Sequence, residues 1–197
     1  ENFKEKINLI CFEPQKEAFS RLKDNYKNFK NVTLINKAIG KHGNHNFYYI
    51  DQSELKKNSY YQNLKFSDGI NSFEKKNLEK RLFNKGIKND LDRFIKKTLI
   101  ETINLKKALD DIEILEKDEK LDLLLIDCEG YDDQVLYNAD LEFFNPKLIY
   151  FEQKNLEVER KRSLLEFLNN KDYFTHSVSN TDVIAVKKIY FKWKKKH

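Results

Sequence analysis

The stretch LDLLLIDCEGYDDQVL, residues 121–136, joins the most apolar run of the chain to its densest group of carboxylates. Residues 123–126 are all apolar, and the acids that follow around Gly130 are Asp127, Glu129, Asp132 and Asp133. A short apolar run of this kind is typical of a strand covered on both faces in a parallel sheet. The spacing of Tyr131, Val135 and Leu136 then favours a helix. The stretch therefore predicts a buried strand that ends in an acid-rich turn.

Two other apolar runs also end in an acid. INLICF, residues 7–12, is followed by Glu13, and PKLIYFE, residues 146–152, ends in Glu152. In an open α/β sheet, ligands bind in the crevice beyond the carboxyl ends of the strands. We therefore expect Glu13, Asp127 and Glu152 to lie around one site.

Strands and helices alternate along most of the chain. An apolar run at residues 7–12, a helical pattern from Gln15 and a second apolar run at residues 31–36 predict a strand, helix, strand crossover. Two alternating segments near the end, YFTHSVS and DVIAVKKIYF, are expected to pair as an antiparallel hairpin. This order predicts an α/β fold with a mainly parallel sheet, helices on both faces of that sheet and an antiparallel closing strand.

The length of 197 residues, with 40% hydrophobic residues, predicts a single domain over residues 1–197. Residues 51–97 are rich in Lys and Asn and have the spacing of an interrupted amphipathic helix, so we expect an insertion there. This segment is either a cover over a pocket or a solvated helical excursion. Residues 189–197 form a one-signed basic tail.

The bulk charge does not indicate a partner. Lys and Arg outnumber Asp and Glu by 37 to 32, but the charges are interleaved, so the net charge of +5 does not predict nucleic-acid binding. We find no cleavable signal and no apolar run near the roughly 20 residues of a membrane helix, and we expect a cytoplasmic protein without a membrane span. Cys11 and Cys128 form neither a disulfide framework nor a zinc set.

Five segments resemble, in their order and approximate spacing, those of FkbM-type methyltransferases. They are FEP at 12–14, NKAIG at 36–40, INLKKALDD at 103–111, LDLLLIDCEGYDDQVL at 121–136 and KLIYFE at 147–152. The closing TDVIAVKK is also similar to the last strand of that family, and the resemblance covers about residues 7–188 apart from the 51–97 segment. It implies a Rossmann-like enzyme that uses S-adenosylmethionine to methylate a hydroxyl of a sugar or another small molecule.

On the cofactor side, the resemblance implies that Glu13 accepts the ribose hydroxyls of S-adenosylmethionine. This agrees with the position of Glu13 at the end of an early strand, just before a helix. The adjoining Pro14 is expected in the same pocket. Contacts to adenine, mainly through the backbone, are implied for the turn formed by Asn36, Lys37 and Ala38.

On the acceptor side, the resemblance implies that Asp127 lies near the methionine moiety and the methyl group, with Glu129 and Glu152 facing the acceptor. Methyl transfer from a sulfonium to an alcohol needs a positioned oxygen and a base for its proton. Glu129 is the first candidate for this base and Glu152 the second. No metal is expected, and Mg²⁺ held by these carboxylates is the lesser alternative. Asp132 and Asp133 have a competing role as caps of the following helix.

One part of the family pattern is absent from the sequence. The first strand and glycine-rich turn of the family precede the FEP segment, but the earliest glycine here is Gly40. We expect that strand and turn to lie upstream of Glu1, since the chain also contains no methionine. The absent strand would run between residues 7–12 and 121–127. Those two strands are therefore expected to stand one strand apart, with Cys11 and Cys128 as free thiols roughly 10 Å from each other.

Three other functions remain as alternatives. The main one is a non-catalytic, methyltransferase-like interaction module that has lost the cofactor loop. A nicotinamide-dependent enzyme could also use Glu13 on a ribose, but it would leave the DCEGYDD segment without a role. An RNA-binding protein is suggested by the basic tail and the many aromatic residues. The sequence predicts neither the methyl acceptor nor the oligomeric state.

Overall fold

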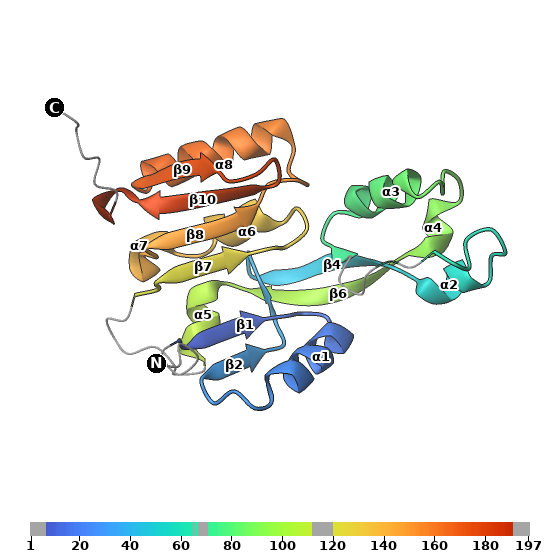
Figure 1. Ribbon diagram of the computed structural model, residues 1–197, viewed down its shortest axis with the longest axis horizontal. Helices are drawn as coiled ribbons and strands as arrows, with labels where there is room; N and C mark the ends of the chain where they lie inside the picture. Colours follow the sequence, from blue (N-terminus) through green and yellow to red (C-terminus); the bar gives the residue numbers. More distant parts are fainter. Residues whose placement is uncertain (1–6, 65, 67–70, 112–119, 191–197) are drawn as a thin grey trace.

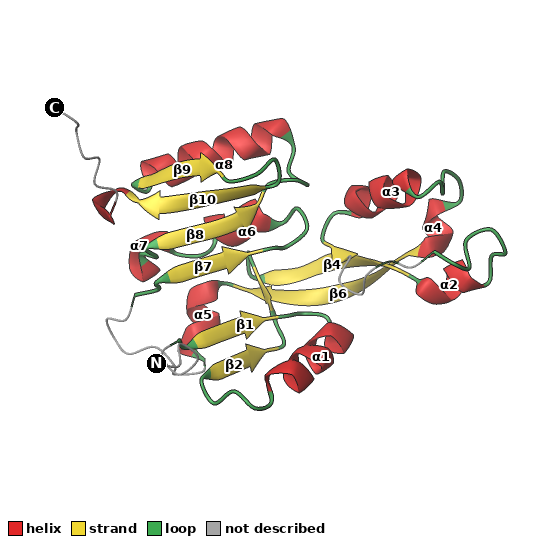
Figure 2. Cartoon of the chain, in the orientation of Figure 1, coloured by secondary structure: helices red, strands yellow, loops and turns green. Residues whose placement is uncertain are grey.

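The strands in the described part of the chain form three sheets (Figure 1). The structure is a computed structural model that describes residues 7–64, 66, 71–111 and 120–190. Within these residues, one sheet has two strands and the other two have four strands each. Figure 2 shows helices packed beside each of these units. The α/β class predicted from the sequence is confirmed.

The larger core surrounds a four-stranded sheet in the second half of the chain. Its strands, in spatial order, are β7 (Leu123–Ile126), β8 (Leu148–Glu152), β10 (Asp182–Lys187) and β9 (Tyr173–Ser177). β7 and β8 are parallel, whereas β10 is antiparallel to both of its neighbours. The predicted closing hairpin is therefore confirmed. Three helices and a short 3₁₀ turn belong to this half, namely α6 (Asp132–Tyr137), α7 (Leu141–Phe144), α8 (Val158–Asn170) and η2 (Lys188–Tyr190).

The first described residues form the predicted strand, helix, strand crossover. β1 (Leu9–Phe12) and β2 (Val32–Ile35) are parallel, with Leu9 opposite Val32, and α1 (Lys16–Tyr26) connects them. The apolar side chains of α1 are only half-buried, and none of them is fully enclosed. Ile10 and Phe12 of β1 nevertheless pack against the larger core.

A long antiparallel hairpin forms the middle of the chain. β4 (Gly43–Ile50) pairs with β6 (Ile95–Ile103), which also pairs with β3 (Ala38–Ile39), while β5 (Asn71–Ser72) pairs with β4. Figure 1 shows α2 (Gln52–Lys56), α3 (Lys75–Asn84) and α4 (Leu91–Phe94) at the far end of this hairpin, and α5 (Leu105–Asp110) after β6. A second, smaller core lies there, built from buried side chains that include Leu55, Leu78, Leu82 and Phe94. The 51–97 segment thus has a hydrophobic core of its own.

The predicted single, mainly parallel sheet is wrong. Among the described strands, three pairs are parallel and four are antiparallel, and they are divided among three sheets. The error arose at the long hairpin of β4 and β6. These strands cover residues 43–50 and 95–103, so they pair antiparallel across the 51–97 segment, and such a long-range pairing is not a local property of the sequence. The basic tail predicted at residues 189–197 lies outside the described residues from position 191 onward.

The prediction that residues 121–127 form a strand covered on both faces is also wrong. Leu123 is 49% exposed and Leu125 is 64% exposed, whereas Ile126 is buried. The physical reason is that the core packs on one face of β7 only, the face that carries Leu124 and Ile126, and Leu123 and Leu125 point from the other face. Helices therefore do not cover both faces of the sheet at this strand.

The strands at residues 7–12 and 121–127, which we expected to stand one strand apart, do not pair with each other, and their spacing stays a prediction. β1 pairs with β2 and β7 pairs with β8, so that β1 and β7 belong to different sheets. Cys11 and Cys128 are both free thiols, as expected. The longest described helix, α8, has 13 residues, and within the described ranges no helix has the length and apolar character required to cross a bilayer.

Candidate active site

Four acids follow or end strands β1, β7 and β8, and we call Glu13, Asp127, Glu129 and Glu152 the site carboxylates. Burial raises the pKa of the Cys128 thiol well above its usual value, and the charges of Asp132, Asp127 and Glu13 raise it further. Burial likewise raises the pKa of Glu152, and the charges of Asp127 and Glu129 add to the rise. The ends of β1, β7 and β8 therefore meet in one acidic region.

Glu129 and Glu152 are joined through one amide. Asn155 Nδ2 donates to Glu129 Oε2 at 2.9 Å and to Glu152 Oε2 at 3.1 Å. Glu129 Oε2 also accepts from Arg81 Nη2 of α3, an ion pair whose two side chains are 28% and 24% exposed. Glu129 therefore has a cationic partner, whereas the Glu152 carboxylate accepts from a neutral amide.

The end of β1 is held by local hydrogen bonds. Glu13 Oε1 accepts from the Gln15 backbone N–H at 2.8 Å. Burial raises the pKa of the Glu13 carboxyl, while that hydrogen bond and the charge of Arg21 oppose the rise. Asn36 Nδ2 donates to the carbonyl oxygens of Glu13 at 2.7 Å and Pro14 at 3.1 Å. The Asn36 side chain thus ties the end of β2 to the end of β1.

The neighbours of Asn36 in the predicted adenine turn have different surroundings. Lys37 is exposed and pairs with Asp111 at 3.5 Å. Ala38 is 3% exposed and belongs to β3, where it pairs with Thr102 of β6. Asn36 and Lys37 are therefore exposed at this turn, whereas the Ala38 side chain is enclosed.

Gln15 is a polar residue of this region that the sequence did not single out. Its Oε1 is a buried oxygen without a hydrogen-bond partner, and it is the one such side-chain atom among the described residues. A buried acceptor without a donor costs about 1–3 kcal/mol. The oxygen therefore suits a ligand donor beside Glu13. The signal available in the sequence was its position immediately after FEP.

Asp132 connects the turn after β7 to the end of β8. Its carboxylate accepts from the backbone N–H groups of Cys128 at 3.4 Å, Gly130 at 3.2 Å and Glu152 at 3.3 Å. The side chain is fully buried, and this burial raises the pKa of Asp132 to about 7 against the opposing effect of the hydrogen bonds. Asp132 therefore ties the turn that carries Glu129 to the end of β8 that carries Glu152, although these two residues are far apart in the sequence.

Asp133 pairs with an arginine of α8. Arg160 Nε donates to Asp133 Oδ2 at 2.8 Å and Arg160 Nη2 donates to Asp133 Oδ1 at 2.5 Å. The same guanidinium donates to the Gly130 carbonyl at 3.1 Å and pairs with Glu74, just before α3. These contacts raise the pKa of Arg160, chiefly through the hydrogen bond to Asp133. Arg160 thus links the acid-rich turn to the 51–97 segment.

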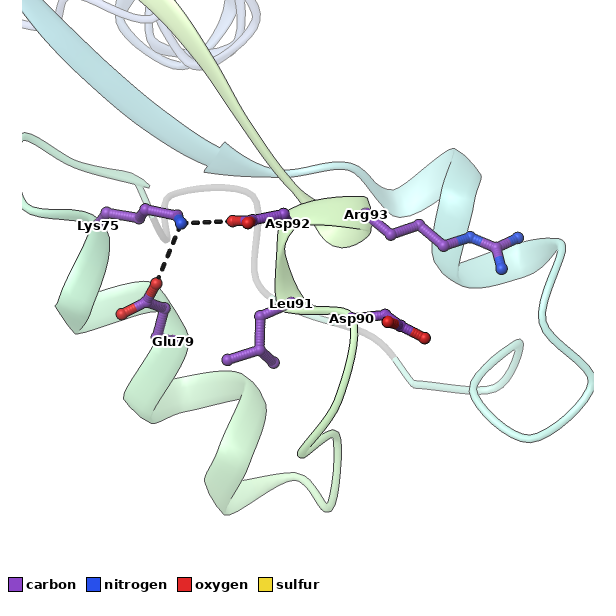
Figure 3. A pocket seen from close by; sticks show the side chains of 6 residues that line it. All are labelled: Lys75, Glu79, Asp90, Leu91, Asp92 and Arg93. Carbon is purple, nitrogen blue, oxygen red and sulfur yellow. Dashed lines mark hydrogen bonds and ion pairs between the residues drawn. The ribbon is translucent and has the colours of Figure 1, made fainter.

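Two pockets lie away from the site carboxylates. One, of about 620 Å³, lies between α3 and α4, and Figure 3 shows Lys75 directed at Asp92 and Glu79 across it. Another, of about 590 Å³, is lined by residues of α5 together with Tyr137, Asn138 and Asp140. Within the described ranges, no group of three His, Cys, Asp or Glu side chains is arranged to hold a metal ion.

The geometry defines an α/β protein with carboxylates gathered at one edge of its strands. A comparison with known protein families is consistent with this class. The family described as "Methyltransferase FkbM domain" matches residues 2–175. The chain belongs to this family of methyltransferase domains. No curated protein and no solved structure matches the chain.

Gly130 is expected to tolerate no side chain. Its φ is +95°, and an added Cβ would lie 2.5 Å from Asn77 Nδ2 and 3.0 Å from Asn155 Cβ. Gly86 has a similar φ of +87° but open space around it, so Gly86→Ala measures the conformational cost alone, at least about 1 kcal/mol. Gly130→Ala should lower the free energy of unfolding in urea by clearly more than Gly86→Ala. Equal losses would show that the packing around Gly130 is not as described.

Asp132 is expected to make the protein less stable as pH rises from about 4 to 7. Its folded-state pKa of about 7 lies above its unfolded value, so the folded state binds more protons in this window and the unfolding free energy falls with pH. Asp132→Asn should flatten this part of the urea-derived stability profile. The exposed Asp24→Asn variant should keep the wild-type slope, and an unchanged slope in Asp132→Asn would contradict the prediction.

Proposed function

We propose that this protein is an S-adenosylmethionine-dependent methyltransferase that methylates a hydroxyl of a sugar or another small molecule. The observation that carries the proposal is the meeting of the site carboxylates at strand ends in a chain of the FkbM family. Acids at this edge of an α/β sheet suit the two hydroxyls of a ribose and an acceptor hydroxyl that must lose its proton.

The residues at the end of β1 fit the nucleoside part of this cofactor. Glu13 Oε1 is engaged by the Gln15 N–H, so we assign the other carboxylate oxygen to the ribose hydroxyls. Gln15 Oε1 lacks a donor and would accept one from the ribose or the adenine amino group. The turn at Asn36, Lys37 and Ala38 would border adenine. The bound cofactor supplies an electrophilic methyl group on its sulfonium.

The surroundings of the two acceptor-side carboxylates support Glu152 as the general base, which reverses the order suggested by the sequence. A base for an alcohol works better when burial raises its pKa, and burial does so at Glu152. Glu129 Oε2 instead already accepts hydrogen bonds from Arg81 and Asn155, so this oxygen is less available to an acceptor hydroxyl. We assign Asp127 to the neighbourhood of the methionine moiety.

One observation favours a second candidate function, a non-catalytic interaction module. Leu123 and Leu125 place two exposed apolar side chains on the same face of the edge strand β7. Exposed apolar side chains on an edge strand are suited to contact with another polypeptide. The module hypothesis requires no affinity for S-adenosylmethionine, so a binding measurement separates the two functions.

Calorimetry of the complete gene product should detect micromolar or tighter binding of S-adenosylmethionine and S-adenosylhomocysteine. Glu13→Ala removes the acceptor of the ribose hydroxyls and should weaken both by at least about tenfold, since charge-assisted hydrogen bonds contribute about 1.5–3 kcal/mol. Glu17→Ala, on the exposed first turn of α1, is the matched control and should bind as the wild type does. Absence of heat from the wild type with either ligand would overturn the proposed function and favour the module.

A further inference from the structure

The 51–97 segment contributes a cation to the acidic site. Arg81 lies on α3, and its guanidinium reaches Glu129 Oε2 across 48 residues of sequence. Leu78 and Leu82, on the same helix, are 1% and 0% exposed and belong to the smaller hydrophobic core. Because α3 is fixed by this core, Arg81 approaches Glu129 from a rigid element rather than from a free loop.

The same segment also holds the backbone of Glu129. Ser72 Oγ and Asn77 Nδ2 donate to the Glu129 carbonyl oxygen at 3.0 Å and 2.9 Å. Glu129 has a φ of 50°, in the left-handed region that costs a residue with a side chain about 1–3 kcal/mol. Contacts to both its carbonyl and its carboxylate thus come from the 51–97 segment, and they stabilise an otherwise unfavourable conformation.

Glu129 is in turn connected to Glu152 through Asn155. Asn155 Nδ2 donates to one oxygen of each carboxylate. The position of Glu129 therefore fixes the orientation in which the Asn155 amide meets Glu152. A continuous series of contacts therefore runs from Arg81 to Glu152. It joins the smaller core to the end of β8.

We propose that Arg81 is a positioning residue of the acceptor site, which holds Glu129 and, through Asn155, orients Glu152 toward the methyl acceptor. The assignment of Glu152 as the base rests on the proposed function, whereas the contacts of Arg81 do not. The proposal gives the 51–97 segment a specific role, because it makes this segment one wall of the acceptor site.

The charges that face Glu152 provide a readout of this role. Asp127 at the end of β7 and Glu129 in the following turn raise the pKa of Glu152, beyond the effect of burial, and Lys154 after β8 and Arg81 of α3 lower it. Removal of the Arg81 charge should therefore raise the pKa of Glu152. Loss of packing alone would not produce a shift with this sign, since opening the site to water would lower a pKa that burial has raised.

The test is a carboxyl ¹³C NMR titration of the full chain with labelled glutamate, in which Glu152→Gln assigns the resonance. Arg81→Met should shift the Glu152 midpoint measurably upward, and Arg81→Lys should restore most of the wild-type value. Arg93→Met, which removes an exposed arginine paired with Glu54, is the matched control and should leave the midpoint unchanged. An unchanged or lower midpoint in Arg81→Met would overturn the proposal.

A second variant covers the case in which Arg81→Met does not fold. Glu129→Gln removes one of the negative charges beside Glu152 and keeps an oxygen for Asn155, so the Glu152 midpoint should fall. A midpoint that does not move in Glu129→Gln would overturn the proposed connection.

Calorimetry with S-adenosylhomocysteine separates the two proposals, since Arg81→Met should bind it within about twofold of the wild type. Absent wild-type binding would remove the proposed function and leave the NMR result on Arg81 standing.

Discussion

The buried Asp132 carboxylate is the interaction on which the proposed site depends. It accepts backbone N–H groups from the turn after β7 and from Glu152 at the end of β8, and it is 0% exposed. A buried carboxylate must be hydrogen-bonded or protonated, and here both conditions contribute because burial raises its pKa to about 7. The separation of Glu129 from Glu152 is therefore set by an internal structural group rather than by the ligand.

The second constraint is the attachment of the 51–97 segment to this turn. Two arginines make this attachment. Arg81 belongs to the 51–97 segment and pairs with Glu129 of the turn, whereas Arg160 of α8 pairs with Asp133 and with Glu74 of the segment. Ion pairs that are only partly exposed and share hydrogen bonds contribute more than solvent-exposed ones. Basic residues from distant parts of the chain thus pair with carboxylates of the acid-rich stretch. These ion pairs offset the repulsion between the carboxylates.

The sequence predicted the local elements well and their assembly less well. Apolar runs ending in an acid identified β1, β7 and β8, because a strand's period and its last residue are local properties. The exposure of Leu125 and the antiparallel β4 and β6 hairpin were not predicted, since both depend on which strands become neighbours. Arg81, Asn155 and Arg160 were missed because their partners lie 48, 26 and 27 residues away. Spacing within one sequence does not encode such contacts.

The central claim is that the ends of β1, β7 and β8 form one site for the cofactor and the acceptor. A crystal structure of the complete gene product with S-adenosylhomocysteine tests it most directly. We expect ribose hydroxyls within hydrogen-bond distance of Glu13, a donor on Gln15 Oε1, and the cofactor sulfur on the side of Asp127 that faces Glu152. Electron density for the ligand at any other place on the molecule, with the Glu13 carboxylate left in solvent, would contradict it.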